Sequence, residues 1–309
     1  MRIVFAGTPA VALPTLSALA DSAHEVVGVV TRPEAARGRS RRPVPSEVGA
    51  WAQDHGIRVL TPQHPRDPDF QESLRELAPD VCPVVAYGAL LPEAALAIPE
   101  HGWINLHFSL LPRWRGAAPV QHALMAGDEV TGATTFRIVW ELDAGPVYDS
   151  IIQPLTGTET AGELLAILAD RGAALMLRTL DQLGVVDPIP QPEGAATLAP
   201  KLTSASAQID WRRTAIEIDR LVRGYSPAPG AWTRFGMDRF RLLLARPSSE
   251  DGLGPGEIRV EKKRVLVGTG TTALELLRVQ PPGKGAMAAP DWGRGIRTDA
   301  PHFEPAEDD

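Results

Sequence analysis

The sequence predicts an α/β protein with a doubly wound, mostly parallel, Rossmann-like sheet and a smaller, OB-like β-barrel domain at the C-terminus. Two observations predict the first part: short apolar, β-branched runs recur along the chain, and helical segments alternate with them. A third predicts the second part, because short strand-like segments separated by glycine and proline fill most of the chain after residue 205. A chain of 309 residues is long enough for both domains.

The first 183 residues are expected to form the larger domain. Its strands are predicted at residues 2–7, 24–31, 58–60, 80–86, 102–107, 132–141 and 145–153. Its helices are predicted at residues 10–20, 47–56 after a Ser46 cap, 69–78, 93–96, 116–127 and 160–183. Most of the strands are apolar along their whole length, which is typical of a parallel sheet covered by helices on both faces.

The stretch between residues 184 and 205 is rich in proline and shows little periodicity, so it is predicted to be a linker. The smaller domain is predicted over residues 206–298, with a helix at 214–223 and short strands at 231–235, 239–245, 256–260, 264–268 and 273–279. Residues 299–309 hold five acidic side chains and are predicted to be a solvated, disordered tail.

Charge is distributed unevenly along the chain. The net charge is −7, yet residues 1–200 hold 14 Lys and Arg against 23 Asp and Glu, whereas residues 201–298 hold 17 against 10. The single cysteine, Cys82, lies in an apolar run and excludes both a disulfide framework and a four-cysteine zinc site. No apolar stretch of about 18 residues occurs, so we expect no membrane span and a cytoplasmic protein.

The densest group of polar side chains lies in residues 102–121, GWINLHFSLLPRWRGAAPVQ. Asn105 and His107 are two apart on a predicted strand, so both project from one face near its carboxyl end. Asp143 lies in a tight Leu-Asp-Ala-Gly-Pro turn after another strand. An imidazole transfers protons near neutral pH, an amide N–H stabilises an oxyanion, and a carboxylate orients the imidazole. Each residue also has an ordinary structural interpretation, and the spacing alone leaves both open.

The residues from 105 onwards match a family. N-L-H-x-S-L-L-P at 105–112 resembles the signature of enzymes that transfer a formyl group from 10-formyltetrahydrofolate. The continuation R-W-R-G-A-A-P-V-Q at 113–121 is similar to the branch of that family that formylates methionyl-tRNA. The similarity extends along nearly the whole chain, through FAGTP at 5–9, VVAYGALLP at 84–92, LDAGPV at 142–147 and further pieces between 209 and 232.

The resemblance implies a catalytic trio of Asn105, His107 and Asp143. We expect no metal, because formyl transfer to an amine needs none and the sequence shows no His, Cys, Asp or Glu spacing that would hold one. It also implies folate contacts from Ser109, Leu110, Leu111 and Pro112, and a pterin pocket lined by Tyr87, Gly88, Leu90, Leu91 and Pro92. The loop 32–45 resembles the insertion with which the family reaches the tRNA acceptor end, here through Arg32, Arg37, Arg39, Arg41 and Arg42. Two positions depart from the family pattern, Val11 in place of a common aromatic residue and Phe108 in place of a small residue or proline.

The function that the resemblance implies is transfer of a formyl group from 10-formyltetrahydrofolate to the α-amino group of methionyl-initiator tRNA, for translation initiation. The partners would be the folate co-substrate and the charged tRNA, held at its acceptor stem and methionyl group by a monomeric enzyme. The basic module 206–298 would hold the rest of the tRNA, which would explain the uneven charge. Trp211 and Trp232 could stack on bases, although core aromatics are the commoner case.

Other functions make different demands on the sequence. A formyltransferase acting on a small-molecule amine, such as a sugar amine or a purine precursor, would keep the trio but would need neither the arginine loop nor the basic module. A non-catalytic folate-binding module would tolerate loss of the trio, which is intact. A dehydrogenase would need a dinucleotide fingerprint, yet the first strand ends in Gly7-Thr8-Pro9 rather than G-x-G-x-x-G.

Overall fold

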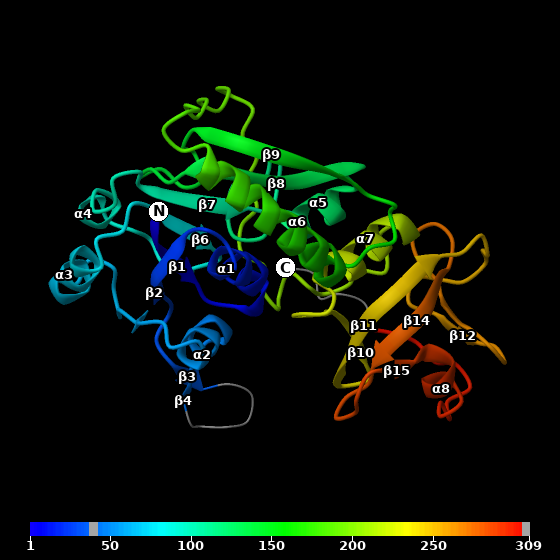
Figure 1. Cartoon of the computed structure of the whole chain (residues 1–309). Coiled ribbons are helices and arrows are strands. Elements are labelled where there is room, and N and C mark those ends of the chain that lie inside the picture. Colours follow the sequence, from blue (N-terminus) through cyan, green and yellow to red (C-terminus); the bar gives the residue numbers. More distant parts are fainter. Residues whose placement is uncertain (37–42, 305–309) are drawn as a thin grey trace. The chain divides into compact units, whose positions relative to one another are not determined.

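A computed structural model describes residues 1–36 and 43–304 of the chain (Figure 1). The chain forms two compact units. The first consists of residues Met1–Pro119, Val130–Pro154 and Leu165–Ala199, and the second of Val120–Glu129, Leu155–Leu164 and Pro200–Asp309. Within the described residues, no helix is both long enough and apolar enough to cross a lipid bilayer.

The first unit is built on a seven-stranded sheet in the order β5-β2-β1-β6-β7-β8-β9. These strands are β1 (Arg2–Gly7), β2 (Glu25–Val30), β5 (Val59–Leu60), β6 (Cys82–Val85), β7 (Trp103–His107), β8 (Val130–Arg137) and β9 (Val147–Pro154). The first five in this order are parallel, whereas β8 and β9 pair antiparallel at one edge. The structure therefore confirms the doubly wound, mostly parallel sheet.

Helices alternate with these strands, as the hydrophobic pattern predicts. They are the 3₁₀ turn η1 (Ala10–Ala12), α1 (Leu13–Ala20), α2 (Glu47–Asp54), α3 (Pro68–Glu76), α4 (Glu93–Leu96), α5 (Pro119–Ala126) and α6 (Ala161–Asp181). The Ser46 hydroxyl accepts a hydrogen bond from the Gly49 N–H, so the predicted cap of α2 is confirmed. Two short strands, β3 (Ala35–Ala36) and β4 (Pro43–Val44), pair antiparallel within the predicted arginine loop.

The order of the parallel strands fixes where a ligand can bind. The chain runs outward from β1 through β2 to β5, then returns to β6 on the other side of β1 and continues to β7. Loops that leave β1 and β6 therefore diverge, and open α/β sheets bind ligands in the crevice beside such a switch point. Here the Thr8 hydroxyl donates to the Tyr87 carbonyl at 2.8 Å and joins the two loops.

The second unit contains a six-stranded antiparallel sheet, curled over an apolar core. Five strands run in the order β10-β11-β14-β13-β12, and β15 pairs with β14. They are β10 (Ala231–Phe235), β11 (Asp238–Pro247), β12 (Ile258–Val260), β13 (Val265–Val267), β14 (Leu274–Gln280) and β15 (Met287–Ala288). The helices α7 (Ala215–Tyr225) and α8 (Ala289–Gly293) complete the unit, and the sequence pattern missed α8 and β15.

The end of the chain corrects one expectation. Residues 299–304 do not form a solvated tail, because Phe303 is completely buried and stacks on Trp211 with ring centroids 5.3 Å apart. The Glu304 N–H donates to the Arg234 carbonyl on β10, and the Phe303 N–H donates to the Gly256 carbonyl just before β12. This segment thus bridges the first and last strands of the sheet and closes it into a barrel. The last five residues, 305–309, lie outside the described residues.

Candidate active site

The strand β7 carries two of the three candidate catalytic side chains. It is central in the sheet, with β6 parallel on one side and β8 antiparallel on the other. Asn105 and His107 lie on the same face because successive side chains of a strand alternate. His107 is only 5% exposed, while Asn105 is half-buried.

The third side chain, Asp143, meets His107 although the two are 36 positions apart. Its Oδ2 atom lies 3.7 Å from the His107 Nδ1 atom, and both side chains are largely buried. On the other side of the ring, Nε2 lies 2.8 Å from the Trp114 carbonyl oxygen. That oxygen can only accept, so a neutral imidazole carries its proton on Nε2 and leaves Nδ1 as the basic nitrogen.

The surroundings of His107 favour this neutral state. Burial lowers the pKa of His107 below its ordinary value, because the charged imidazolium loses its hydration. The negative charge of Asp143 and the bond to the Trp114 carbonyl act in the opposite direction but do not cancel the effect of burial. A neutral imidazole with a carboxylate beside its free nitrogen is suited to take up a proton and to hold it briefly.

Asp143 is held in an unusual backbone conformation. Its φ is +49°, a left-handed value that costs energy for any residue other than glycine. The Gly116 N–H donates to Oδ2 at 2.7 Å and fixes the carboxylate. Two residues on, Gly145 is required, since a Cβ atom there would lie 1.7 Å from the Arg137 carbonyl oxygen. Strained, closely packed turns of this kind are concentrated at functional sites.

The loop after β7 is organised by the neighbouring strand. The Thr134 hydroxyl on β8 donates to the Ser109 carbonyl at 2.7 Å, and the Leu111 N–H donates to the Thr134 hydroxyl at 3.3 Å. Ser109 itself is completely buried, and its hydroxyl donates to the Arg113 carbonyl at 2.6 Å. The Ser109 side chain therefore shapes the loop, whereas Leu110, Leu111 and Pro112 are half-buried and present apolar surface.

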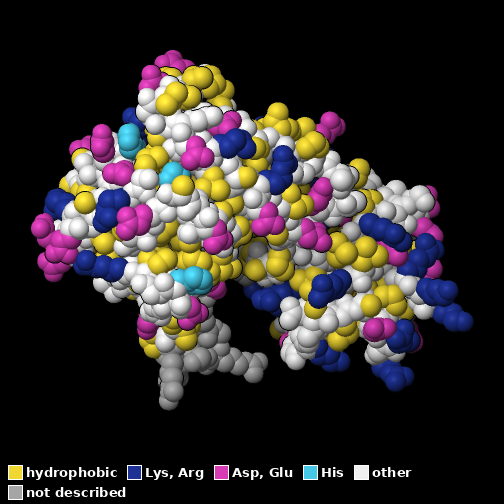
Figure 2. Space-filling model, viewed as in Figure 1, with side chains coloured by type: hydrophobic (Ala, Val, Ile, Leu, Met, Phe, Trp, Pro, Cys, Tyr) yellow, Lys and Arg dark blue, Asp and Glu magenta, His cyan; other side chains and the backbone are white. Residues whose placement is uncertain are grey.

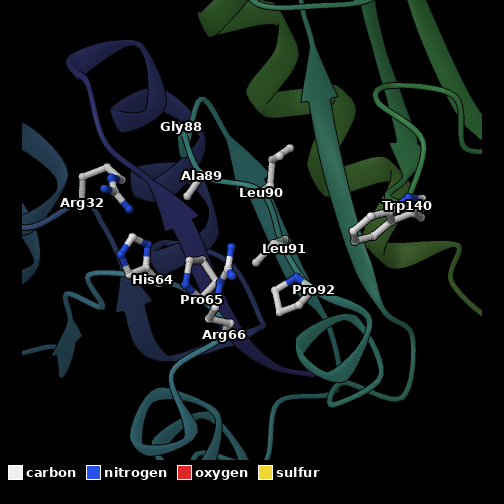
Figure 3. A pocket seen from close by; sticks show the side chains of 10 residues that line it. All are labelled: Arg32, His64, Pro65, Arg66, Gly88, Ala89, Leu90, Leu91, Pro92 and Trp140. Atoms are coloured by element: carbon white, nitrogen blue, oxygen red, sulfur yellow. The ribbon is translucent and has the colours of Figure 1, made fainter.

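A cavity of about 540 Å³ lies at the loops after β2, β5 and β6. Residues 88–92, which the sequence analysis assigned to a pterin pocket, line it together with Arg32, His64, Pro65, Arg66 and Trp140. Figure 3 shows Arg32 and His64–Arg66 on one side of the 88–92 loop and Trp140 on the other. Trp140 is 76% exposed and comes from the same connection as Asp143, so the cavity lies beside the loop that carries this candidate catalytic carboxylate.

Tyr87, which directly precedes this loop, is not among the residues that line the cavity. Its hydroxyl is buried and has no hydrogen-bond partner among the described residues, and burial raises the pKa of Tyr87 to about 12 although the charge of Arg32 opposes the rise. A buried polar group left unpaired costs free energy, so an incoming ligand with a polar group at this point would gain from pairing with it.

Only one of the five candidate tRNA-binding arginines falls in the described part of the loop. Arg32 donates to the Gln63 carbonyl at 3.3 Å and lines the cavity, so it belongs to the small-molecule pocket as much as to the loop. The other four, Arg37, Arg39, Arg41 and Arg42, lie outside the described residues.

The basic side chains of the second unit are not equally available. Figure 2 shows Lys and Arg side chains projecting around the region of β12, β14 and α8, and Lys262 and Lys263 are exposed there. Arg223, by contrast, is buried against Asp219 and cannot reach a phosphate. Arg264 is paired with Glu250 and Glu261. Trp211 and Trp232 belong to the core, as the commoner case for aromatics predicts.

No group of three or more His, Cys, Asp and Glu side chains suited to a metal ion occurs among the described residues. Of the two positions that depart from the family pattern, Phe108 is buried and Val11 is half-buried. The sequence pattern did not indicate the two backbone groups that hold His107 and Asp143, the Trp114 carbonyl and the Gly116 N–H. Backbone groups have no sequence signature, so only the surrounding R-W-R-G run could have indicated them.

Comparisons with known proteins show which family the chain matches. A family described as "Formyl transferase" matches residues 1–180, and "Formyl transferase, C-terminal domain" matches residues 201–297. A methionyl-tRNA formyltransferase of a Nocardioides species is 58% identical over 302 residues, which is 96% of each chain. That of Streptomyces coelicolor is 56% identical over 301 residues, 96% of this chain and 97% of the relative.

Solved structures with low identity share the fold. The sugar 3N-formyl transferase WlaRD, 14% identical, gives a TM-score of 0.68 and covers 92% of this chain and 99% of its own. HypX from Aquifex aeolicus in complex with tetrahydrofolic acid, 17% identical, gives a TM-score of 0.66 and covers 94% of this chain and 46% of its own. On the strength of the two family matches and the near-full-length relatives, the chain belongs to the formyl transferase family.

Proposed function

We propose that this protein transfers the formyl group of 10-formyltetrahydrofolate to the α-amino group of methionyl-initiator tRNA and so produces N-formylmethionyl-tRNA. One observation carries the proposal: the His107–Asp143 pair lies at the carboxyl end of β7, with Asn105 on the same face of that strand, in a chain 54–58% identical to three relatives named methionyl-tRNA formyltransferase. The sugar formyl transferase WlaRD is only 14% identical to it.

The cavity beside the 88–92 loop suits a folate. Its volume of about 540 Å³ lies within the range of small-molecule sites, and its walls are largely apolar with cationic groups at Arg32 and Arg66. The apolar side chains of Leu91 and Trp140 would face a flat ring system, and the arginines would attract carboxylates. We therefore assign the pterin and folate contacts to Tyr87, Gly88 and Leu90–Pro92, with Leu110–Pro112 on the adjoining loop.

The folate supplies the formyl carbon, bonded to N10, and the residues of this chain supply orientation and proton transfer. An Asn105 amide N–H stabilises the negative charge that develops on the formyl oxygen as the amine attacks. The neutral His107 accepts the proton that the amine loses, at Nδ1, and returns it to the departing N10 when the C–N10 bond breaks. Asp143 stabilises the imidazolium in between, because its carboxylate lies 3.7 Å from Nδ1.

The tRNA partner is proposed to engage the arginine-rich loop. Arg39→Ala combined with Arg41→Ala should raise KM for charged tRNA and flatten the dependence of log KM on log salt by about 1 for each phosphate that the loop no longer neutralises. Glu34→Ala, an exposed change on the same loop, is the matched control. A salt dependence equal to that of the control would remove the loop from the tRNA interface.

The proposed function is tested by asking which amine becomes formylated. The protein is incubated with 10-formyltetrahydrofolate and either methionyl-initiator tRNA or a nucleotide-linked amino sugar, and the products are identified by mass spectrometry. We expect formylation of the methionyl group and at most trace formylation of the sugar. The variant Asn105→Ala should reduce kcat by about 10²–10³-fold. Preferential formylation of the amino sugar would contradict the proposal.

A further inference from the structure

The segment that joins the two units is bonded into the candidate active site along much of its length. The backbone of Ile189 pairs with that of Val147 through two hydrogen bonds of 2.7 and 2.8 Å. Further on, the Arg115 N–H donates to the Thr197 carbonyl at 2.8 Å, and the Arg115 carbonyl accepts from the Ala199 N–H at 2.7 Å. Residues 189–199, which the sequence pattern assigned to a linker, are thus part of the catalytic unit.

One side chain of this segment reaches the turn that carries Asp143. The Gln191 amide nitrogen lies 2.8 Å from the Asp143 carbonyl oxygen and 2.8 Å from the Gly145 carbonyl oxygen, so its two N–H groups satisfy both. The Gln191 oxygen accepts from the Arg115 guanidinium at 3.0 and 2.7 Å. Both N–H groups of the Gln191 amide are therefore used in bonds to this turn. The bonds from Arg115 to the amide oxygen fix which way the amide faces.

These bonds act where the backbone is under strain. A left-handed residue such as Asp143 costs of order 1–3 kcal/mol and persists only when the surrounding structure over-determines it. Gln191 holds the carbonyls of Asp143 and Gly145, the residues on either side of Ala144, and so it fixes the backbone of the turn that carries the Asp143 side chain. The Gly116 N–H then holds the carboxylate itself at 2.7 Å.

The same segment also fixes the other member of the pair. The Thr197 hydroxyl accepts from the Trp114 N–H at 2.9 Å, and the Trp114 carbonyl accepts from His107 Nε2 at 2.8 Å. Trp114 has a left-handed φ of +63°, which again needs support from its neighbours. The 189–199 segment therefore bonds both to Trp114, whose carbonyl holds His107, and to the turn that carries Asp143.

We propose that Gln191 is a positioning residue for formyl transfer, which holds the Asp143 carboxylate against His107 by bonding the Asp143 and Gly145 carbonyls. The role rests on the proposed function, because it concerns the same reaction. Gln191 touches no reacting atom in this arrangement; it acts through Asp143. It keeps the Asp143 carboxylate in its place beside His107. Misplacement of a catalytic group by about 1 Å can reduce the rate about 10²-fold.

The test compares Gln191→Ala and Gln191→Glu with Glu193→Ala, an exposed change two residues further along the same segment. Gln191→Glu keeps the length and the acceptor for Arg115 but removes both N–H donors, so it should resemble Gln191→Ala. We expect kcat to fall about 10- to 100-fold in both variants, with KM for folate and tRNA changed less than about threefold. Glu193→Ala should leave kcat within about twofold of the unsubstituted protein.

A second readout separates positioning from loss of folded protein. The imidazole pKa of His107 is followed by NMR, with the His107 signal assigned from its absence in His107→Asn. A displaced Asp143 raises the His107 pKa less, so the His107 midpoint should move to lower pH in both Gln191 variants and not in Glu193→Ala. This measurement needs no substrate, so it stands even if a different amine proves to be the acceptor. An unchanged kcat, or a lower kcat with an unmoved His107 midpoint, would overturn the proposal.

Discussion

The His107–Asp143 pair of the first unit and the Arg223–Asp219 pair of the second are both buried, yet they are built differently. Arg223 Nε and Asp219 Oδ2 lie 2.9 Å apart on successive turns of α7, and Arg223 also donates to the Glu159 carbonyl at 3.2 Å. His107 Nδ1 and Asp143 Oδ2 are 3.7 Å apart, and the two residues come from the end of β7 and from the turn between β8 and β9. The Arg223–Asp219 contact is a direct hydrogen bond, whereas the distance between His107 and Asp143 is too long for one.

The chemistry of the two cations explains this difference. A guanidinium stays protonated in proteins, so Arg223 can only hold its partner. An imidazole with a pKa lowered by burial is neutral near pH 7 and can take up a proton. Backbone groups, the Trp114 carbonyl and the Gly116 N–H, hold the outer ends of the reactive pair. The His107–Asp143 pair is thus held by backbone groups on either side of it, whereas the Arg223–Asp219 pair is held by its own hydrogen bond.

The largest effect is expected from breaking the structural pair. Asp219→Ala leaves the Arg223 charge buried without a counter-ion, which should cost about 3–5 kcal/mol of unfolding free energy. Hydrogen exchange of the α7 amides measures this loss within the second unit. Asp219→Asn keeps an acceptor oxygen and should cost clearly less. A loss below about 1 kcal/mol in Asp219→Ala would mean that the pair does not hold the unit together.

Breaking the reactive pair should change the rate instead of the stability. In Asp143→Asn, the side chain can still accept from the Gly116 N–H, so the turn should persist. The imidazolium loses its counter-charge, and we expect kcat to fall by about 10²–10³-fold. Pre-steady-state formylation assays measure the rate, and calorimetry should show a melting temperature within about 2 °C of the unsubstituted protein. If Asp143→Asn lost as much stability as Asp219→Ala, the His107–Asp143 pair would also serve mainly to stabilise the fold.

The closure of the second unit provides a smaller test of the same contrast. Phe303→Ala removes a buried ring near the chain end, where the surroundings can partly collapse, so we expect a loss of about 2–3 kcal/mol. Glu304→Ala is the control, since its backbone makes the bridge to Arg234 and its side chain is exposed. Denaturant unfolding of both variants should separate them. If Phe303→Ala and Glu304→Ala were equally stable, the prediction of a free tail at residues 299–304 would be correct after all.

Sequence alone predicted the parts of this molecule that depend on local pattern. The alternating strands and helices, the Ser46 cap and the β7 location of Asn105 and His107 follow from hydrophobic periodicity and strand alternation. The pairing of His107 with Asp143 was expected only from clustering and from family resemblance. Its supports were not predictable, because the Trp114 carbonyl and the Gly116 N–H are backbone groups whose direction depends on tertiary contacts.

Two segments were misjudged for a related reason. Residues 189–199 and 301–304 have little periodicity, so they were interpreted as linker and tail. Their bonds are made by backbone groups, by Gln191, or by one aromatic ring, Phe303. An irregular segment that packs through backbone hydrogen bonds leaves almost no compositional trace. Composition therefore separates strands from loops better than it separates bonded loops from free ones.

The pH dependence of single-turnover formyl transfer tests the central claim most directly. Protonation of His107 occupies Nδ1, so the rate should fall as pH decreases through the His107 pKa, which burial lowers from its ordinary value. Asp143→Asn removes a charge that raises this pKa, so the midpoint of the acid limb should move to still lower pH. An acid limb above the ordinary range for histidine, or one that Asp143→Asn leaves in place, would contradict a proton-accepting His107 paired with Asp143.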